Sequence, residues 1–84
     1  MNSITMYTTD YCPYCHAAKA LLRSRGLSYA EIDVTTDADK QAEMIERSGR
    51  RTVPQVFFDD KHIGGNDDLQ RYVRNVVDAE TAAA

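Results

Sequence analysis

Apolar and polar residues alternate, or recur at helical spacing, in successive segments of the chain. The β-branched and aromatic run Ile4–Thr8 predicts a first strand. A helix is predicted to begin at the cysteines near residue 12 and to end at Gly26, with Ala17, Ala18, Leu21 and Leu22 on its apolar side. Alternating apolar and acidic residues predict a second strand over Ser28–Val34. We expect these elements to form a βαβ unit with parallel strands and a right-handed crossover.

A second helix is predicted after the second strand. Thr36 or Asp37 can cap its start, and Gly49 suits the end of a helix that runs to about Ser48. Apolar residues at i, i+4 and i+7 define its expected core-facing side, which consists of Ala38, Ala42 and Ile45.

The last third of the chain predicts a hairpin and a final helix. Two short strands, Gln55–Asp59 and Lys61–Gly64, are joined tightly enough for antiparallel pairing. The final helix starts at Asp67 or Asp68 and carries an apolar stripe through Val77, whereas residues 79–84 have nothing to pack against and should fray. The order β-α-β-α-β-β-α predicts one α/β domain over residues 1–84, with a four-stranded mixed sheet flanked by three helices.

The length and charge of the chain favour some classes of protein and argue against others. Eighty-four residues suffice for a single modest core. The chain has no leading apolar signal segment and no apolar run of membrane-spanning length, so we expect a cytoplasmic protein without membrane contact. The formal net charge of −3 argues against nucleic-acid binding, which needs a basic face.

The two cysteines of the chain, Cys12 and Cys15, stand three residues apart. In the first turn of a helix, side chains at this spacing lie roughly 5–6 Å apart at Cβ, close enough to form a disulfide after modest adjustment. Pro13 supports this placement, because proline suits the first helical position. Cys12 would then cap the helix, where unpaired N–H groups and the helix dipole stabilise a thiolate. We therefore predict that Cys12 is a nucleophile and that Cys15 resolves the mixed disulfide formed on it.

A structural disulfide and a zinc site are the alternative interpretations of this pair. A bridge that closes so short a loop removes little entropy from the unfolded chain. A zinc site needs about four ligands, and only His16 and His62 could join the two cysteines, without a second ligand pair at the usual spacing. A C-x-x-C beside a βαβ pattern favours redox chemistry, and we predict no metal site.

The chain resembles a dithiol glutaredoxin, of the thioredoxin-like fold, from Ile4 to about Val77. The resemblance rests on three motifs: Cys12-Pro13-Tyr14-Cys15, Thr52-Val53-Pro54 and Gly64-Gly65-Asn66-Asp67-Asp68. It implies that the proline of the second motif is cis and that the loop carrying Thr52, Val53 and Pro54 faces the cysteines. The Val53 backbone would then pair with glutathione as an added strand. Tyr14, by the same resemblance, shapes the wall of the binding groove.

The resemblance also implies how the two ends of glutathione are held. The N–H groups of Asn66 and Asp67, at the start of the last helix, would bind the γ-glutamyl carboxylate. The Asp67 side chain would face the γ-glutamyl ammonium; its simpler role is a helix cap, and the two roles are compatible. Gly64 and Gly65 permit backbone angles closed to other residues and a close approach of the ligand. Gln41 matches the family residue that binds the glycyl carboxylate.

One position departs from the family pattern. Thr9 stands where the family often has a lysine just before the cysteine motif, and acidic Asp10 follows it. A missing cation and a nearby anion disfavour both the thiolate and the bound glutathione. Arg50 and Arg51, in the loop before the second motif, are candidates to replace this cation, and His16 is expected to be a surface residue.

The activity that the resemblance implies is glutathione-dependent reduction of protein–glutathione mixed disulfides and protein disulfides by a monomer. Glutathione would be a co-substrate and no cofactor would be tightly bound; the expected partners are glutathionylated or disulfide-containing proteins, with ribonucleotide reductase compatible as one of them. Two alternatives remain: an electron donor to ribonucleotide reductase that is fed by thioredoxin reductase, and a carrier of an iron–sulfur cluster held between two subunits by Cys12 and bound glutathione. Pro13 and Cys15 argue against the carrier, because relatives built for that role usually keep one cysteine followed by Gly-Phe.

Overall fold

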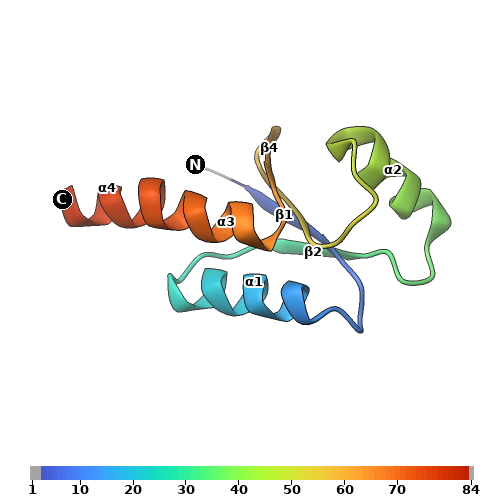
Figure 1. Cartoon of the computed structure of the whole chain (residues 1–84), viewed down its shortest axis with the longest axis horizontal. Helices are drawn as coiled ribbons and strands as arrows, with labels where there is room; N and C mark the ends of the chain where they lie inside the picture. Colours follow the sequence, from blue (N-terminus) through green and yellow to red (C-terminus); the bar gives the residue numbers. More distant parts are fainter. Residues whose placement is uncertain (1–2, 84) are drawn as a thin grey trace.

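The computed structural model describes residues 3–83 of the chain. Four strands form one sheet in the order β2-β1-β3-β4 (Figure 1). They are β1 (Ile4–Thr8), β2 (Ala30–Asp33), β3 (Gln55–Phe58) and β4 (Lys61–Gly64). Strand β1 pairs parallel with β2 and antiparallel with β3, and β3 pairs antiparallel with β4. The predicted mixed sheet, the parallel first pair and the hairpin are therefore confirmed.

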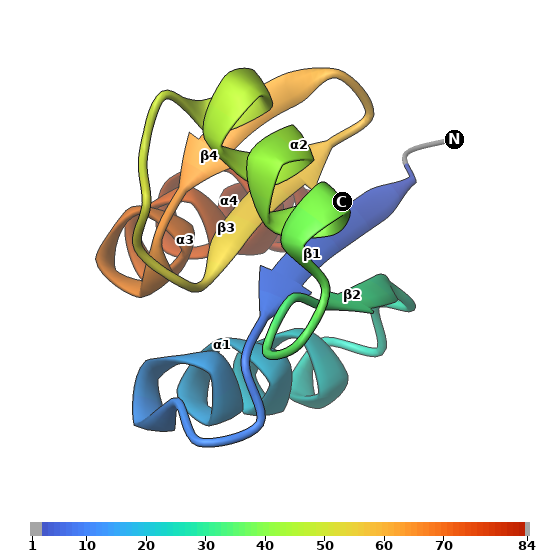
Figure 2. The same cartoon turned by 90° about the vertical axis from the view of Figure 1, so that its right-hand side faces the viewer.

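Three helical segments flank the sheet. The first two are α1 (Pro13–Ser24) and α2 (Ala38–Ser48). The third is continuous from α3 (Asn66–Tyr72) through a π-helical stretch, η1 (Val73–Val77), into α4 (Asp78–Ala83). Helices α1 and α3 lie on one face of the sheet and α2 on the other (Figure 2), which confirms the predicted fold class. Within residues 3–83, no helix has the length and apolar character needed to cross a membrane.

Side chains that alternate along β1 and β3 divide the core between the two faces. On one face, α1 and α3 close over a cluster made of Ile4, Met6, Ala18, Leu22, Val56, Phe58, Leu69 and Val73. On the other, α2 covers a smaller cluster made of Tyr7, Val34, Met44 and Phe57. In the β1–β3 register, Tyr7 near the end of β1 lies opposite Gln55 at the start of β3. The loop after β1 and the loop before β3 are thereby brought to the same edge of the sheet.

The buried side of α2 differs from the predicted one. Met44 is fully buried and Ile45 is half-buried, whereas Ala38 and Ala42 are exposed. The prediction was right for Ile45, which packs against the smaller cluster, and wrong for the two alanines. Alanine offers little apolar area, so the larger side chains of Met44 and Ile45 decide which side of the helix turns to the sheet. Asp37 caps this helix, as predicted, by accepting a hydrogen bond from the Lys40 N–H.

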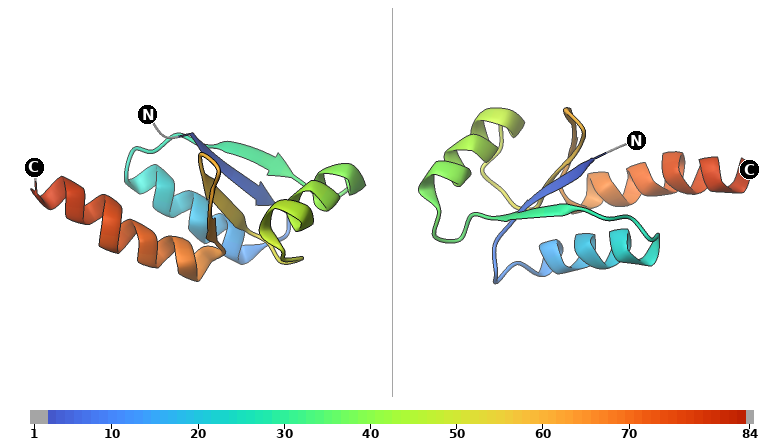
Figure 3. Two further views of the ribbon diagram at one scale, coloured as in Figure 1. Left: turned by 90° about the horizontal axis from the view of Figure 1, so that it is seen from above. Right: turned by 180° about the vertical axis from the view of Figure 1, so that it is seen from behind.

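The C-terminal helix is longer than predicted and extends past the sheet (Figure 3). Residues 79–83, which the sequence predicts to fray, belong to α4, and Ala84 lies outside the described residues. Alanine is the best helix former, and extending an existing helix gains one hydrogen bond for each residue fixed, which favours a helix beyond the apolar stripe that ends at Val77. Two hydrogen bonds from Arg25 to the Asp78 carboxylate, at 2.8 and 2.9 Å, tie this helix to the end of α1.

Candidate active site

Cys12 caps the N-terminus of α1, as the cysteine spacing predicted. Its backbone is extended (φ −97°, ψ 111°), and its Sγ accepts a hydrogen bond from the Cys15 N–H at 3.1 Å. Pro13 is the first helical residue. A thiolate at this position receives an N–H bond and faces the positive end of the helix dipole. Cys12 is 6% exposed and Cys15 is 0% exposed, so Cys12 is the cysteine that solvent and a substrate can reach.

Cys15 lies one turn further into the helix and is a free thiol, as is Cys12. Burial raises the pKa of the Cys15 thiol to about 12, and its hydrogen bond with Cys12 acts in the same direction. A hydrogen bond from the Thr9 backbone and the charge of Lys19 oppose this rise. Cys15 therefore stays protonated near neutral pH, which suits a thiol that reacts second.

Lys19 is held at the α1 face of the sheet by an ion pair. It stands four residues after Cys15, on the same side of α1. Its Nζ lies 3.0 Å from Glu31 Oε2, and the Thr8 hydroxyl donates to the same oxygen at 2.7 Å. These two hydrogen bonds, first that of Thr8 and then that of Lys19, lower the pKa of the Glu31 carboxyl. With its side chain only 13% exposed, Lys19 is a fixed charge near the buried thiol.

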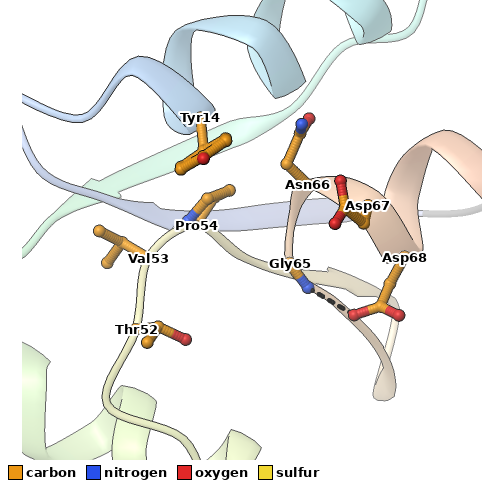
Figure 4. A pocket seen from close by; sticks show the side chains of 8 residues that line it. All are labelled: Tyr14, Thr52, Val53, Pro54, Gly65, Asn66, Asp67 and Asp68. Carbon is orange, nitrogen blue, oxygen red and sulfur yellow. Dashed lines mark hydrogen bonds between the residues drawn. The ribbon is translucent and has the colours of Figure 1, made fainter.

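A groove with a volume of about 320 Å³ lies between the first turn of α1, the α2–β3 loop and the start of α3 (Figure 4). It is lined by Tyr14 of α1, by Thr52, Val53 and Pro54 of the α2–β3 loop, and by Gly65, Asn66, Asp67 and Asp68 at the start of α3. The Val53–Pro54 peptide is cis. Cys12 Sγ donates a weak hydrogen bond to the Val53 carbonyl oxygen at 3.7 Å. The nucleophile predicted from the sequence therefore touches the wall of this groove.

Gly64 adopts a backbone conformation that other residues avoid. Its φ is +125°, and a Cβ built there would lie 2.2 Å from Asp68 Oδ2. Gly65, in contrast, has ordinary extended angles (φ −88°, ψ −161°). Of the two residues, only Gly64 therefore has a φ angle that requires glycine.

The last helix begins earlier than predicted, and its capping residues differ. Gly65 is the N-cap and Asn66 the first helical residue, so the expected start at Asp67 or Asp68 was late. The Asp68 carboxylate accepts a hydrogen bond from the Gly65 N–H at 3.1 Å and another from Arg50 Nη1 at 3.2 Å. These bonds, that of Gly65 first, lower the pKa of the Asp68 carboxyl. The capping role considered for Asp67 was wrong, and Asp67 lines the groove instead.

Most of the predicted glutathione-binding residues come together at this groove. Six of them line it: Tyr14, Thr52, Val53, Pro54, Asn66 and Asp67. Gln41 does not line it; this side chain is exposed on α2. The sequence interpretation placed Gly65 close to the ligand but gave Asp68 no role at the groove wall. A glycine followed three residues later by an acidic residue resembles a capping box, and that signal could have identified the pair.

Arg50 and Arg51 are the candidates to replace the cation that Thr9 does not supply. The Arg50 guanidinium pairs with Asp68 of the groove wall, and Arg51 is exposed. Thr9 itself is 7% exposed, and its Oγ1 has no hydrogen-bond partner among the described residues. His16 is exposed, as predicted.

Comparisons with known proteins agree on one family. A family model described as Glutaredoxin matches residues 4–63. The chain is 56% identical over 69 residues to Glutaredoxin 3 of Escherichia coli (strain K12), covering 82% of this chain and 83% of that protein. Among solved structures, a glutaredoxin from Brucella melitensis superposes with a TM-score of 0.79 at 44% identity, over 94% of this chain and 87% of that one.

A buckwheat glutaredoxin–glutathione complex is also similar, with a TM-score of 0.78 at 35% identity, over 88% of this chain and 70% of that chain. The family model spans well over half of this chain, and the E. coli relative is covered over most of its own length. The pair Cys12 and Cys15 occupies the redox-active position at the head of α1. The chain therefore belongs to the glutaredoxin family, a family of oxidoreductases.

Proposed function

We propose that this protein catalyses glutathione-dependent thiol–disulfide exchange, reducing protein–glutathione mixed disulfides and protein disulfides. The observation that carries the proposal is the contact of Cys12 Sγ with the Val53 carbonyl, because it joins a helix-capping nucleophile to a groove. The groove volume lies at the lower end of the range of small-molecule sites, roughly 300–1,000 Å³. The similar buckwheat glutaredoxin was solved as a complex with glutathione, which supports the tripeptide as the ligand here.

Glutathione would lie along the groove with its sulfur next to Cys12. Its cysteinyl backbone would pair with the Val53 backbone, as an added strand does. Its γ-glutamyl carboxylate would accept hydrogen bonds from the N–H groups of Asn66 and Asp67, and its ammonium would face the Asp67 carboxylate. Gln41, outside the groove lining, would reach only the glycyl carboxylate at the outer end.

With a glutathionylated protein as substrate, the Cys12 thiolate attacks the glutathione sulfur. The Cys12–glutathione disulfide forms, the protein–glutathione disulfide breaks, and the protein sulfur leaves as a thiolate that takes up a proton. A second glutathione thiolate then attacks the bound glutathione sulfur. Oxidised glutathione leaves and the Cys12 thiolate is restored. In this cycle the protein sulfur is reduced to a thiol and one free glutathione molecule is oxidised; the other half of the oxidised glutathione comes from the substrate.

A protein disulfide requires both cysteines. The Cys12 thiolate attacks one sulfur and remains linked to the protein by a mixed disulfide. Cys15 then loses its proton and attacks Cys12 Sγ, which forms the Cys12–Cys15 disulfide and releases the second protein thiol. Two glutathione molecules reduce this disulfide. The raised pKa of the buried Cys15 keeps it from competing for the first attack.

A hydroxyethyl disulfide assay coupled to glutathione reductase tests the proposal. The wild-type protein should turn over, and Cys12→Ser should abolish turnover with every substrate. Cys15→Ser should retain reduction of a glutathionylated peptide and lose reduction of a protein disulfide. Loss of both activities in Cys15→Ser would contradict the division of roles.

Two control measurements address the alternative functions. Turnover driven by thioredoxin reductase, with no response to glutathione, would favour the thioredoxin-reductase-fed donor. Visible charge-transfer absorption in anaerobically purified protein would favour the iron–sulfur carrier. We expect neither result.

A further inference from the structure

A buried polar side chain supports the wall of the groove from behind. Gln55, the first residue of β3, is 0% exposed. Its Nε2 donates to the Thr52 carbonyl oxygen at 2.9 Å and to Thr52 Oγ1 at 3.2 Å. Its Oε1 lies 2.7 Å from His62 Nε2 on β4. This side chain therefore joins a groove-lining residue to the neighbouring strand.

The direction of these hydrogen bonds follows from the chemistry of each partner. A carbonyl oxygen only accepts, so the amide nitrogen of Gln55 must face Thr52 and the amide oxygen must face His62. Because the Gln55 oxygen also accepts only, His62 Nε2 must carry the hydrogen. His62 thus donates to Gln55, and Gln55 donates to Thr52. This arrangement fixes His62 as the Nε2–H tautomer when the ring is neutral.

His62, the first donor in this hydrogen-bond network, packs against the core. The His62 ring packs on Phe57, with ring centroids 4.9 Å apart at 35°. Phe57 is 2% exposed and meets Tyr7 edge-on at 5.9 Å. Burial lowers the pKa of His62, and the charge of Arg50 acts in the same direction against that of Asp68. His62 is therefore a rigid, neutral donor at neutral pH.

We propose that Gln55 and His62 are positioning residues for glutathione: they hold the Thr52 carbonyl, and through it the Val53–Pro54 segment, at the wall of the groove. The inference rests on the proposed function, because it names residues that act on the same groove. Neither side chain lines the groove, so both act through Thr52. Removing a partner leaves a buried donor or acceptor unpaired, and the loop can regain that bond only by moving.

The test compares three variants with the wild-type protein in the glutathione-dependent assay. Gln55→Met keeps the shape of the side chain and removes its three hydrogen bonds, two to Thr52 and one from His62. His62→Phe keeps the stacking on Phe57 and removes the hydrogen bond that His62 donates to Gln55. Val56→Ala is the matched control, because Val56 is the next residue of the same strand, is equally buried and faces the other side of the sheet. We expect the KM for a glutathionylated peptide to rise about tenfold in Gln55→Met and about threefold in His62→Phe, with kcat changed less than about twofold.

A spectroscopic readout separates positioning from a general loss of stability. Long-range ¹H–¹⁵N NMR correlations of the wild-type protein should show the Nε2–H tautomer of His62. The Thr52 and Val53 amide resonances should shift in Gln55→Met. They should stay in place in Val56→Ala, although we expect the cavity left by that substitution to destabilise the protein.

Three outcomes would overturn the inference: an Nδ1–H tautomer in the wild type, a KM within about twofold of wild type in both Gln55→Met and His62→Phe, or an equal rise of KM in Val56→Ala. Failure of the proposed function looks different. In that case the wild-type protein itself shows no glutathione-dependent turnover, and the positioning role in glutathione binding fails with it.

Discussion

The two halves of the candidate site are built in different ways. The cysteine half is contained in one helical turn, where Cys12 accepts the N–H of Cys15 and Pro13 starts the helix. The groove half joins segments that lie more than ten residues apart in sequence, the Thr52–Pro54 loop and the Gly65–Asp68 turn. Local helix geometry forms the first half, whereas the second depends on buried polar contacts between strands. We therefore expect substitutions behind the groove to weaken glutathione binding while Cys12 remains reactive.

Gly64→Ala should give the largest effect on the groove half. A side chain at φ +125° is strained, and its Cβ would overlap the Asp68 carboxylate, so we expect a loss of about 2–5 kcal/mol in the free energy of unfolding. Gly26→Ala is the control, because Gly26 also has a positive φ but no atom within 4 Å of a Cβ; it should lose only about 1–2 kcal/mol. Urea unfolding measures both. Equal losses would show that the Asp68 overlap has no energetic consequence.

Asp68→Asn should have an intermediate effect that depends on pH. The folded-state pKa of Asp68 is lowered by the Gly65 N–H and by Arg50, so its contribution to stability is present above about pH 4 and is lost as the pH falls through the folded pKa. The carboxylate is partly exposed, so we expect a loss of about 1 kcal/mol at pH 7 and a smaller loss at pH 3. The KM for glutathionylated peptide should rise several-fold.

Asp78→Asn is the control for this prediction. Asp78 pairs with Arg25 away from the groove, and its pKa is lowered by that pair. Its variant should show the same kind of acid dependence in urea unfolding without any change in KM. A KM change in Asp78→Asn, or a pH-independent loss in Asp68→Asn, would contradict this account.

Lys19→Met should give the smallest effect, confined to the cysteine half. The charge of Lys19 opposes the rise in the pKa of Cys15, so its removal raises that pKa further and leaves less Cys15 thiolate at a given pH. We expect formation of the Cys12–Cys15 disulfide to slow about threefold to tenfold, with turnover of a glutathionylated peptide unchanged. Rapid-quench trapping of the mixed disulfide measures the step. Arg23→Met, an exposed cation one turn further on, should match wild type.

The sequence predicted the cysteine half more completely than the groove half. The i, i+3 spacing of Cys12 and Cys15 with Pro13 between them was sufficient to predict the helix cap, because each contact is made within one turn. For the groove, the motifs identified six lining residues, yet the helix start and the capping role of Asp68 were missed. Those features depend on how the β4–α3 turn folds over Gly64.

What the sequence alone determined is therefore the order of strands and helices, the parallel first strand pair, the hairpin and the position of Cys12 at the cap of α1. These follow from periodicity and spacing, which act over a few residues. Only the tertiary structure decided that Lys19 is held by Glu31, that Arg50 pairs with Asp68, and that Gln55 joins His62 to Thr52. Such contacts link residues far apart in the chain, and burial, which gives each polar group few possible partners, selects them only after the sheet has formed.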